Sequence, residues 1–305
     1  MSSYILRRLI QSIYVVFGLS ILVFGILHIT GDPALVILPP NVTAQELADF
    51  RQKMGFNDPL YVQYARFLSR AVRGDFGMSF MQTQPALGLV LERLPATAEL
   101  ATAAIAFSVL LAVPAGILAA LKKDRVADVV SMLAALLGQS MPAFWLGILL
   151  LMVFSVWFDL FPVAGRGSIR HMVLPAITLG SFTAARIARL TRSEMLEVLG
   201  QDFVTTARAK GLREWLVVNK HAFRNAIVPV LSVIALEFGS VLGGAVITET
   251  IFAWPGVGRL MVEAIFDRDF PVVQAGVLTI AVLLVLLNLV VDLMYAWIDP
   301  RIRFT

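Results

Sequence analysis

The feature that most constrains this sequence is a series of apolar runs, each near the roughly 20 residues that a helix needs to cross a bilayer. Hydrophobic residues make up 58% of the 305-residue chain and charged residues only 15%, far from the balance of a water-soluble domain. Because lipid offers no partner for free backbone groups, each run is expected to be helical. The pattern predicts an all-α membrane protein rather than a barrel of short alternating strands.

We predict six transmembrane helices, at about 9–29, 98–121, 129–161, 172–185, 226–247 and 272–297. The first lacks the short apolar region and cleavage site of a signal peptide, so it is expected to be retained. The third is predicted as one long helix bent near Pro142. The fourth, which is short and polar, is expected to lie inside the bundle. In the fifth, Ala235, Gly239 and Gly243 form a small-residue stripe that permits close helix packing.

These spans divide the chain into residues 1–30 with the first helix, a long extracytoplasmic loop over 31–96, and a core over 97–305. Within the loop, Thr43 and Glu46 predict a capping box, and "FNDPL" predicts a turn before a second short helix. Six crossings place both termini on one side of the membrane. Basic residues next to short loops mark that side as cytoplasmic; they are Arg7, Arg8, Lys122, Lys123, Arg125, Arg301 and Arg303.

The cytoplasmic loop over 190–224 reads as two short amphipathic helices that meet at a glycine. Asp202 is expected to cap a helix that begins at Phe203, and Gly211 is expected to end it. A second helix begins near Arg213. Periodicity leaves two interpretations open. The pair either lies on the lipid surface, or docks another protein through exposed small residues while its basic residues steer an acidic partner.

The segments "TTARAKG" and "HAFRNAIVP" resemble the cytoplasmic loop of ABC-importer permeases, in the form found in the dipeptide and oligopeptide branch. Gly211 stands at the glycine of that loop, whereas Thr205, Thr206 and Ala207 replace its usual Glu-Ala-Ala. Further motifs follow the order of such permeases over nearly the whole chain; they are "GDPA", "DPLYVQY", "GDFGMSF", "PAFWLGILL", "FPVAG", "VLPAITLG", "ETIFAWPGVGRL" and "DFPVVQAG".

The resemblance implies one half of a two-permease channel in a bacterial cytoplasmic membrane, for di- or oligopeptides or a related small solute. Its implied partners are a second homologous permease subunit, two ATP-binding subunits that hold ATP and Mg, an extracytoplasmic solute-binding protein, and membrane lipid. No cofactor is expected on this chain itself. The residues implied to dock an ATP-binding subunit are Phe203, Thr206, Ala207, Arg208, Ala209, Lys210, Gly211, Leu212, His221, Arg224 and Asn225.

The sequence lacks the residues that several kinds of function would require. There is no GxxxxGK[ST] phosphate loop, so the chain is not expected to hydrolyse ATP. It has no cysteine, and its three histidines are scattered, so no metal site is expected. The net charge of +4 comes from basic residues at the ends of apolar runs, which membrane topology explains better than nucleic-acid binding.

Two rival functions remain for a chain of this kind. A self-contained secondary transporter or channel would couple movement to an ion through inverted repeats, and the sequence shows no convincing repeat. An intramembrane hydrolase would need catalytic groups at membrane depth, and no serine–lysine pair or aspartate pair stands there. Copurification of an ATPase would separate an ABC permease from both.

Polar residues within the apolar runs are candidates for the transport pathway. Glu237 lies deep in the fifth span, where a carboxylate is costly unless it faces water or a partner. It either lines the pathway or makes an internal hydrogen bond across the bundle, and Asn288 is a candidate of the same sort. Asp292 is expected to reach the interface or to pair with a neighbouring arginine.

The segment between the fifth and sixth spans is rich in turn residues. It contains Trp254, Pro255, Gly256 and Gly258. These residues either form an outer lip, which meets the binding protein or closes an outer gate, or belong to a plain interfacial belt.

Overall fold

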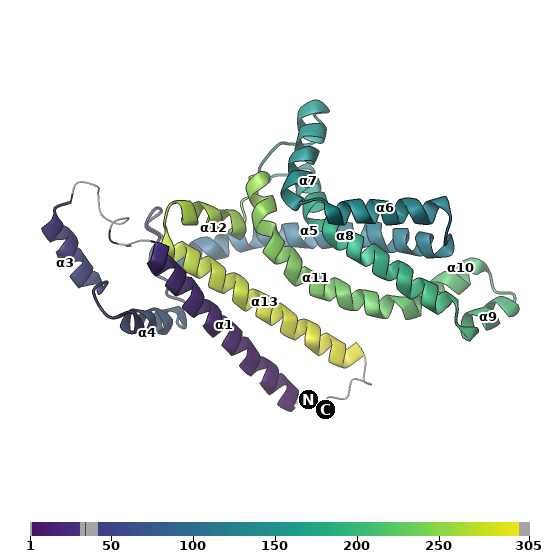
Figure 1. Ribbon diagram of the computed structural model, residues 1–305, viewed down its shortest axis with the longest axis horizontal. Helices are drawn as coiled ribbons and strands as arrows, with labels where there is room; N and C mark the ends of the chain where they lie inside the picture. The colour runs from purple at the N-terminus through teal and green to yellow at the C-terminus, as the bar shows by residue number, and fades with distance from the viewer. Residues whose placement is uncertain (1, 31–33, 35–41, 299–305) are drawn as a thin grey trace. The chain divides into compact units, whose positions relative to one another are not determined.

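The computed structural model describes residues 2–30, 34 and 42–298. Arg301 and Arg303, which the topology prediction counts among the cytoplasmic basic residues, lie outside these ranges. Every regular element in the described residues is a helix, and one isolated β-bridge pairs Met78 with Pro85. The all-α prediction is confirmed. The chain divides into two compact units, one made of Met1–Ala96 with Pro255–Thr305 and the other of Thr97–Trp254 (Figure 1).

The first unit is built on two long helices that pack along each other, α1 (Ser2–Thr30) and α13 (Phe270–Ile298) (Figure 1). Arg8 Nε lies 3.2 Å from Asp292 Oδ2, so the predicted pairing of Asp292 with an arginine is confirmed. The apolar core of this unit includes Val90 at the start of α5 (Ala86–Leu121), Val257 of α12 (Val257–Phe266) and Ala275 of α13. Each of these three side chains is fully buried.

The described part of the first loop begins with the predicted capping box. The Thr43 side chain accepts from the backbone N–H of Glu46, and the Thr43 N–H donates to the Glu46 carboxylate at 2.8 Å. The Thr43 hydroxyl also donates to this carboxylate, at 2.8 Å, and the bonds donated by the backbone and hydroxyl of Thr43 hold the pKa of Glu46 below its usual value of 4.5. The capped helix, α3 (Ala44–Met54), ends at Gly55, whose φ of 73° suits a residue without a Cβ.

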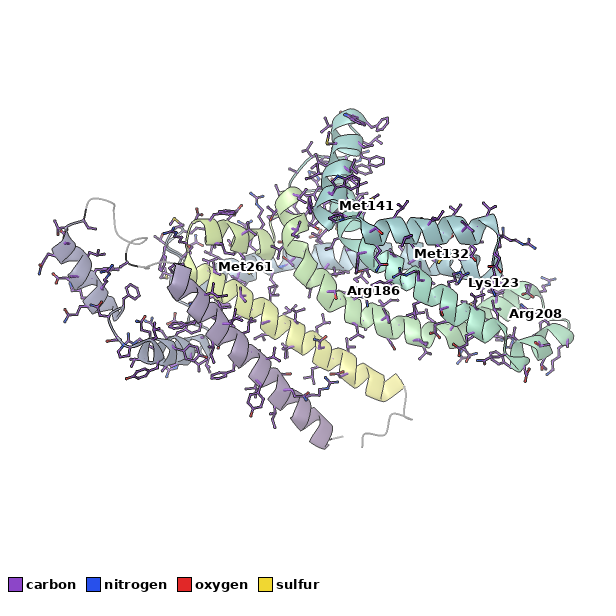
Figure 2. All side chains as sticks on the ribbon, viewed as in Figure 1. Lys123, Met132, Met141, Arg186, Arg208 and Met261 are labelled. Atoms are coloured by element: carbon purple, nitrogen blue, oxygen red, sulfur yellow. The ribbon has the colours of Figure 1, made fainter. Side chains whose placement is uncertain are left out.

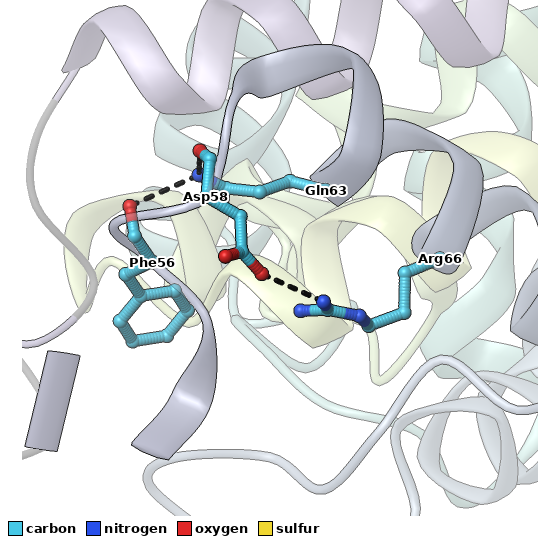
Figure 3. A network of polar contacts seen from close by, with 4 residues as sticks. All are labelled: Phe56, Asp58, Gln63 and Arg66. Atoms are coloured by element: carbon cyan, nitrogen blue, oxygen red, sulfur yellow. Dashed lines mark hydrogen bonds and ion pairs between the residues drawn. The ribbon is translucent and has the colours of Figure 1, made fainter. Parts of the chain in front are cut away.

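The "FNDPL" turn is confirmed as the link from α3 to α4 (Leu60–Ala71). Figure 3 shows how side chains of α4 hold it. The Gln63 amide donates to the carbonyls of Phe56, at 3.0 Å, and Asp58, at 2.8 Å. Arg66 Nη2 lies 2.7 Å from Asp58 Oδ2. Helix α4 therefore holds the turn through hydrogen bonds to two carbonyls of the turn and through one ion pair.

The second unit is a bundle centred on α8 (Ile169–Leu199), which packs against α6 (Val126–Ser140), α7 (Ala143–Leu150) and α11 (Phe223–Ile251) (Figure 1). Buried positions of α8 run from Leu174 to Val198. The fourth predicted span therefore lies inside a bundle, as expected. Its helix is longer than predicted and extends well beyond Ala185. The remaining elements are η1 (Leu151–Trp157), α9 (Asp202–Ala209), α10 (Glu214–Leu216) and η2 (Val217–Ala222).

The third predicted span is broken rather than gently bent. Met141 has an extended backbone, with φ −82° and ψ 127°, because a following proline disfavours the helical conformation. The helices on either side of Met141 and Pro142 meet at 107°. The place of the bend was therefore predicted correctly. The prediction of one long helix was wrong, since a proline at this position ends α6 and starts α7.

Three described helices are long and apolar enough to cross a bilayer: Ala86–Leu121, Glu214–Ile251 and Phe270–Asp292. The bent pair formed by α6 with α7 and η1 is a fourth candidate. A shorter apolar stretch, Ile10–Ile26, lies within α1. Helix α8 does not pass this test on composition, which agrees with its polar and buried character. The count of six spans stays a prediction.

Close helix packing occurs at Gly180 and Gly116, which were not singled out from the sequence. A Cβ added to Gly180 of α8 would lie 2.6 Å from the carbonyl oxygen of Ala104, and one added to Gly116 of α5 would lie 2.6 Å from that of Ala188. Ser108 donates to the Gly180 carbonyl at 2.7 Å. By contrast, a Cβ on Gly243 would meet nothing within 4 Å. Helices α5 and α8 therefore make a close approach, whereas Gly243 does not pack closely on another described residue.

We expect Gly180→Ala to destabilise the second unit by about 1–3 kcal/mol, because the new methyl group forces α5 and α8 apart. Gly243→Ala is the matched control, since it adds the same group to open space in a helix that alanine favours. Thermal unfolding of the two purified variants in detergent measures the difference. Equal melting temperatures for Gly180→Ala and the wild type would contradict the close packing described here.

Candidate functional site

The helix pair predicted within residues 190–224 is present as α9, α10 and η2, a unit that we call the hairpin (202–222). Helix α9 begins one residue earlier than expected, so Gln201 takes the N-cap position and Asp202 lies in the first turn. Gly211, with φ 77°, follows the C-terminus of α9. Its N–H donates to Arg208 and that of Leu212 donates to Ala207, which is the Schellman pattern of a glycine-terminated helix.

One face of the hairpin is buried against the chain itself. Val204 and Ala207 of α9 pack on Val217, Val218 and Ala222 of η2. The same cluster continues into Met195 and Val198 at the end of α8, Ala226 at the start of α11 and Ala120 at the end of α5. The hairpin is therefore packed against the C-terminal ends of α5 and α8 and the N-terminal end of α11, and it is not a free loop.

The opposite face carries most of the residues implied to dock a partner. Those exposed on the hairpin are Phe203, Thr206, Arg208, Ala209, Lys210, Gly211 and Leu212, and Arg224 and Asn225 are exposed at the start of α11. Ala207 is buried and His221 is half-buried, so neither offers its full side chain to a partner. Phe203 is exposed, whereas Val204 beside it is buried. Trp215 also points outward and is 71% exposed.

An ion pair braces the two arms of the hairpin across the glycine. Arg208 Nη2 donates to Glu214 Oε1 at 2.7 Å, and Arg208 Nε donates to Glu214 Oε2 at 3.2 Å. Figure 2 labels Arg208 at this position. Both side chains are substantially exposed, so the pair adds little stability and mainly sets the angle of the turn. The guanidinium of Arg208 is already engaged within the chain.

A second, more buried pair near the hairpin was missed by sequence reasoning. Arg192 of α8 forms a bidentate contact with Asp128 of α6: Nε donates to Oδ1 at 2.6 Å and Nη2 donates to Oδ2 at 2.7 Å. Asp128 also accepts from the backbone N–H of Asp124, and its side chain is almost fully buried. Asp128 occupies the first turn of α6, where a carboxylate is favoured. That position is the sequence signal from which the structural role of Asp128 could have been predicted. The pair fastens α6 to the end of α8 that carries the hairpin.

Glu237 is brought together with two residues of α8. Arg186 Nη1 lies 2.5 Å from Glu237 Oε1, and the Thr183 hydroxyl donates to Oε2 at 3.2 Å. Glu237 is almost completely buried, whereas the Arg186 side chain is 46% exposed. The internal bond across the bundle is thus present. Asn288 is exposed on α13. Pathway lining by either residue stays a prediction.

The candidates for an outer lip divide between the two units. Trp254, at the end of the second unit, is only 1% exposed, and the guanidinium of Arg166 lies 6.0 Å from its ring centroid. Its burial places the indole inside the unit rather than on a contact surface. Pro255, Gly256 and Gly258 belong to the first unit, where Gly256 precedes α12 and both glycines are buried. No group of His, Asp and Glu among the described residues could hold a metal ion.

Two family models match this sequence. A model described as binding-protein-dependent transport system inner membrane component matches residues 112–304, and the model of the N-terminal part of such membrane components matches residues 1–101. The dipeptide transport system permease protein DppB of Alkalihalophilus pseudofirmus is 41% identical over 333 aligned residues. The glutathione transport system permease protein GsiC of Escherichia coli strain K12 is 43% identical over 305. Both alignments cover all of both chains.

A solved structure is also similar in fold. It is a crystal structure of an amino acid ABC transporter with histidines, with a TM-score of 0.52. The match covers 70% of this chain and 94% of that one, at 16% sequence identity. At this identity the likeness concerns the fold alone.

Asp128→Asn should lower the melting temperature more than Glu214→Gln does, because the first change leaves Arg192 without its charge partner in a mostly buried contact. The second change affects an exposed pair that is screened by water. Unfolding of both variants in the same detergent and salt checks the order. A larger effect from Glu214→Gln would show that the hairpin brace, and not the contact between α6 and α8, stabilises this end of the bundle.

Proposed function

The chain belongs to the family of binding-protein-dependent transport system inner membrane components, and we propose that it forms half of the translocation pathway for di- or oligopeptides or a related small solute. Membership makes it a permease subunit of an ABC importer, which is not itself the catalytic subunit. The peptide class is supported by the names of its relatives, which specify a dipeptide in one case and glutathione in the other.

The importer that we propose contains this chain, a second homologous permease subunit, two ATP-binding subunits and an extracytoplasmic solute-binding protein. The family description already names the dependence on a binding protein and the inner membrane. We place both termini and the hairpin in the cytoplasm. Support for that orientation is the gathering of basic residues beside the short loops, among them Lys122, Lys123 and Arg125.

The observation that carries the proposed mechanism is the two-sided character of the hairpin. Its inner face, through Val204 and Ala207, packs on the bases of α5, α8 and α11, whereas its outer face at Gly211 is open. A side chain that is locked in a packed cluster transmits displacement, because close-packed interiors deform little. A partner that grips the outer face would therefore move the three helices with it, as a rigid body.

The outer face suits a protein better than a lipid surface. On α9 it presents Phe203 among Thr205, Thr206, Ala209 and Lys210, while Val204 and Ala207 point inward. Beyond the glycine, Leu212 and Trp215 are exposed as well. A helix that floats on lipid needs a broad, continuous apolar side facing the membrane, and the exposed side of α9 has one aromatic residue among polar and small ones. Small residues around a positive-φ glycine let another backbone approach closely. We infer that this surface docks in a groove of an ATP-binding subunit.

Gly211→Asp should reduce copurification of the ATP-binding subunits with the tagged permease by about tenfold or more, since a charged side chain would occupy the docking surface. Gly165→Asp is the matched control. Gly165 also has a positive φ, of 91°, and a Cβ there would also meet nothing within 4 Å, so the backbone cost is comparable. Gly165 lies outside the hairpin, in the loop before α8. Equal retention of the ATP-binding subunits by the two variants would refute the docking role.

The permease reconstituted without its partners should not accumulate peptide against a gradient, because the sequence contains no phosphate-binding loop. Adding the ATP-binding subunits and the loaded binding protein to the same liposomes should restore uptake that stops when ATP is withheld. Uphill uptake by the permease alone would overturn the ABC mechanism and favour a self-contained secondary transporter.

A further inference from the structure

The contact between Arg186 and Glu237 lies at the middle of the bundle. Glu237 stands near the centre of the apolar stretch 226–247, with about 15 Å of helix on either side, which is half of a bilayer's hydrocarbon thickness. The Arg186 guanidinium is at the same depth, because its Nη1 lies 2.5 Å from Glu237 Oε1. In Figure 2, Arg186 is labelled beside the two packed helices α8 and α11.

The two members of this pair differ in their exposure. The Glu237 carboxylate is enclosed, and both of its oxygens have partners, Arg186 and Thr183. The Arg186 side chain is 46% exposed, and its Nε and Nη2 have no protein partner in the described part of the chain. Glu237 therefore holds one edge of the guanidinium in place while the other edge stays available.

The exposed edge of Arg186 cannot face lipid at this depth. A charged group near the bilayer centre is strongly disfavoured unless it meets water or protein. Snorkelling to the headgroups is prevented as well, because the bond to Glu237 fixes the guanidinium near the midplane. The open edge is therefore left for water in the pathway or for a neighbouring subunit.

We infer that Arg186 contacts the carboxylate of a peptide in transit and that Glu237 is the residue that positions it. This inference rests on the proposed function. A guanidinium presents planar, paired N–H donors that match the two oxygens of a carboxylate. The partner Glu237 keeps the local net charge near zero when the pathway is empty, so the site attracts the carboxylate through directed donors rather than through a large positive field.

The test compares uptake of trialanine with uptake of trialanine amide, which lacks the terminal carboxylate. The complete importer is used, and both peptides are supplied at concentrations that saturate the binding protein. The binding protein is the same in every assay, so its own preference cancels when permease variants are compared. Arg186→Gln should lower the ratio of acid to amide uptake by about tenfold, which corresponds to the loss of one charge-assisted contact.

Two further variants complete the test. The double variant Arg186→Gln with Glu237→Gln removes both charges together, so no buried carboxylate loses its partner and the fold is kept. It should show the same fall in the ratio. Arg189→Gln removes a charge one turn further along α8, from a side chain with no carboxylate partner in the described residues, and should keep the wild-type ratio.

A wild-type ratio in the assembled double variant would overturn the inference. So would an equal fall in Arg189→Gln, because the effect would then be one of overall charge. Separation of the two permease subunits in Arg186→Gln, with an unchanged ratio in the assembled double variant, would instead place Arg186 at the contact between permeases. Failure of the proposed function is distinguishable, since wild-type uptake would then not depend on the ATP-binding subunits at all.

Discussion

Lipid supplies no hydrogen bonds, and this constraint governs the polar groups throughout the bundle. A polar side chain that enters it is costly unless it meets a partner or water; the buried hydroxyls of Thr191 and Thr248 have no hydrogen-bond partner in the described residues. The Thr178 hydroxyl donates a hydrogen bond to the carbonyl of Leu174, one turn earlier in the same helix. Glu249, which is fully buried, accepts from Thr97 of another helix at 2.7 Å. The helices are thus joined by a few directed contacts in addition to apolar packing, and these contacts fix which faces meet.

Features that depend on local sequence were predicted well. The capping box of Thr43 and Glu46, the turn at "FNDPL" and the glycine stop at Gly211 each follow from residues within four or five positions of one another. A proline likewise marked the end of α6. The sharpness of the 107° break was not predictable, because the angle depends on what α6 and α7 pack against and not on Pro142 itself.

Contacts between distant segments were the part that the sequence could not supply. The sequence showed that Glu237 needed a partner but not that Arg186, on another helix, would be it. Gly243 looked suitable for close packing, yet a Cβ there would meet nothing within 4 Å, whereas Gly180 and Gly116 do make a close approach. For the candidate docking surface, the type of element was predictable, whereas the inward turn of Ala207 depended on the packing of η2 and α8.

The π-helical segment η2, the last element of the hairpin, joins it to α11 and affects how motion passes along the chain. A π-helical turn accommodates one residue more than an α-helical turn does, and each residue of an α-helix advances the side chains by about 100°. The six residues Val217–Ala222 therefore set the rotational phase of α11 relative to α9 and α10. That phase decides whether Glu237 faces α8. A tightening of η2 into ordinary helix would turn α11 about its own axis, so a movement applied at the hairpin can reach the middle of the membrane as a twist as well as a displacement.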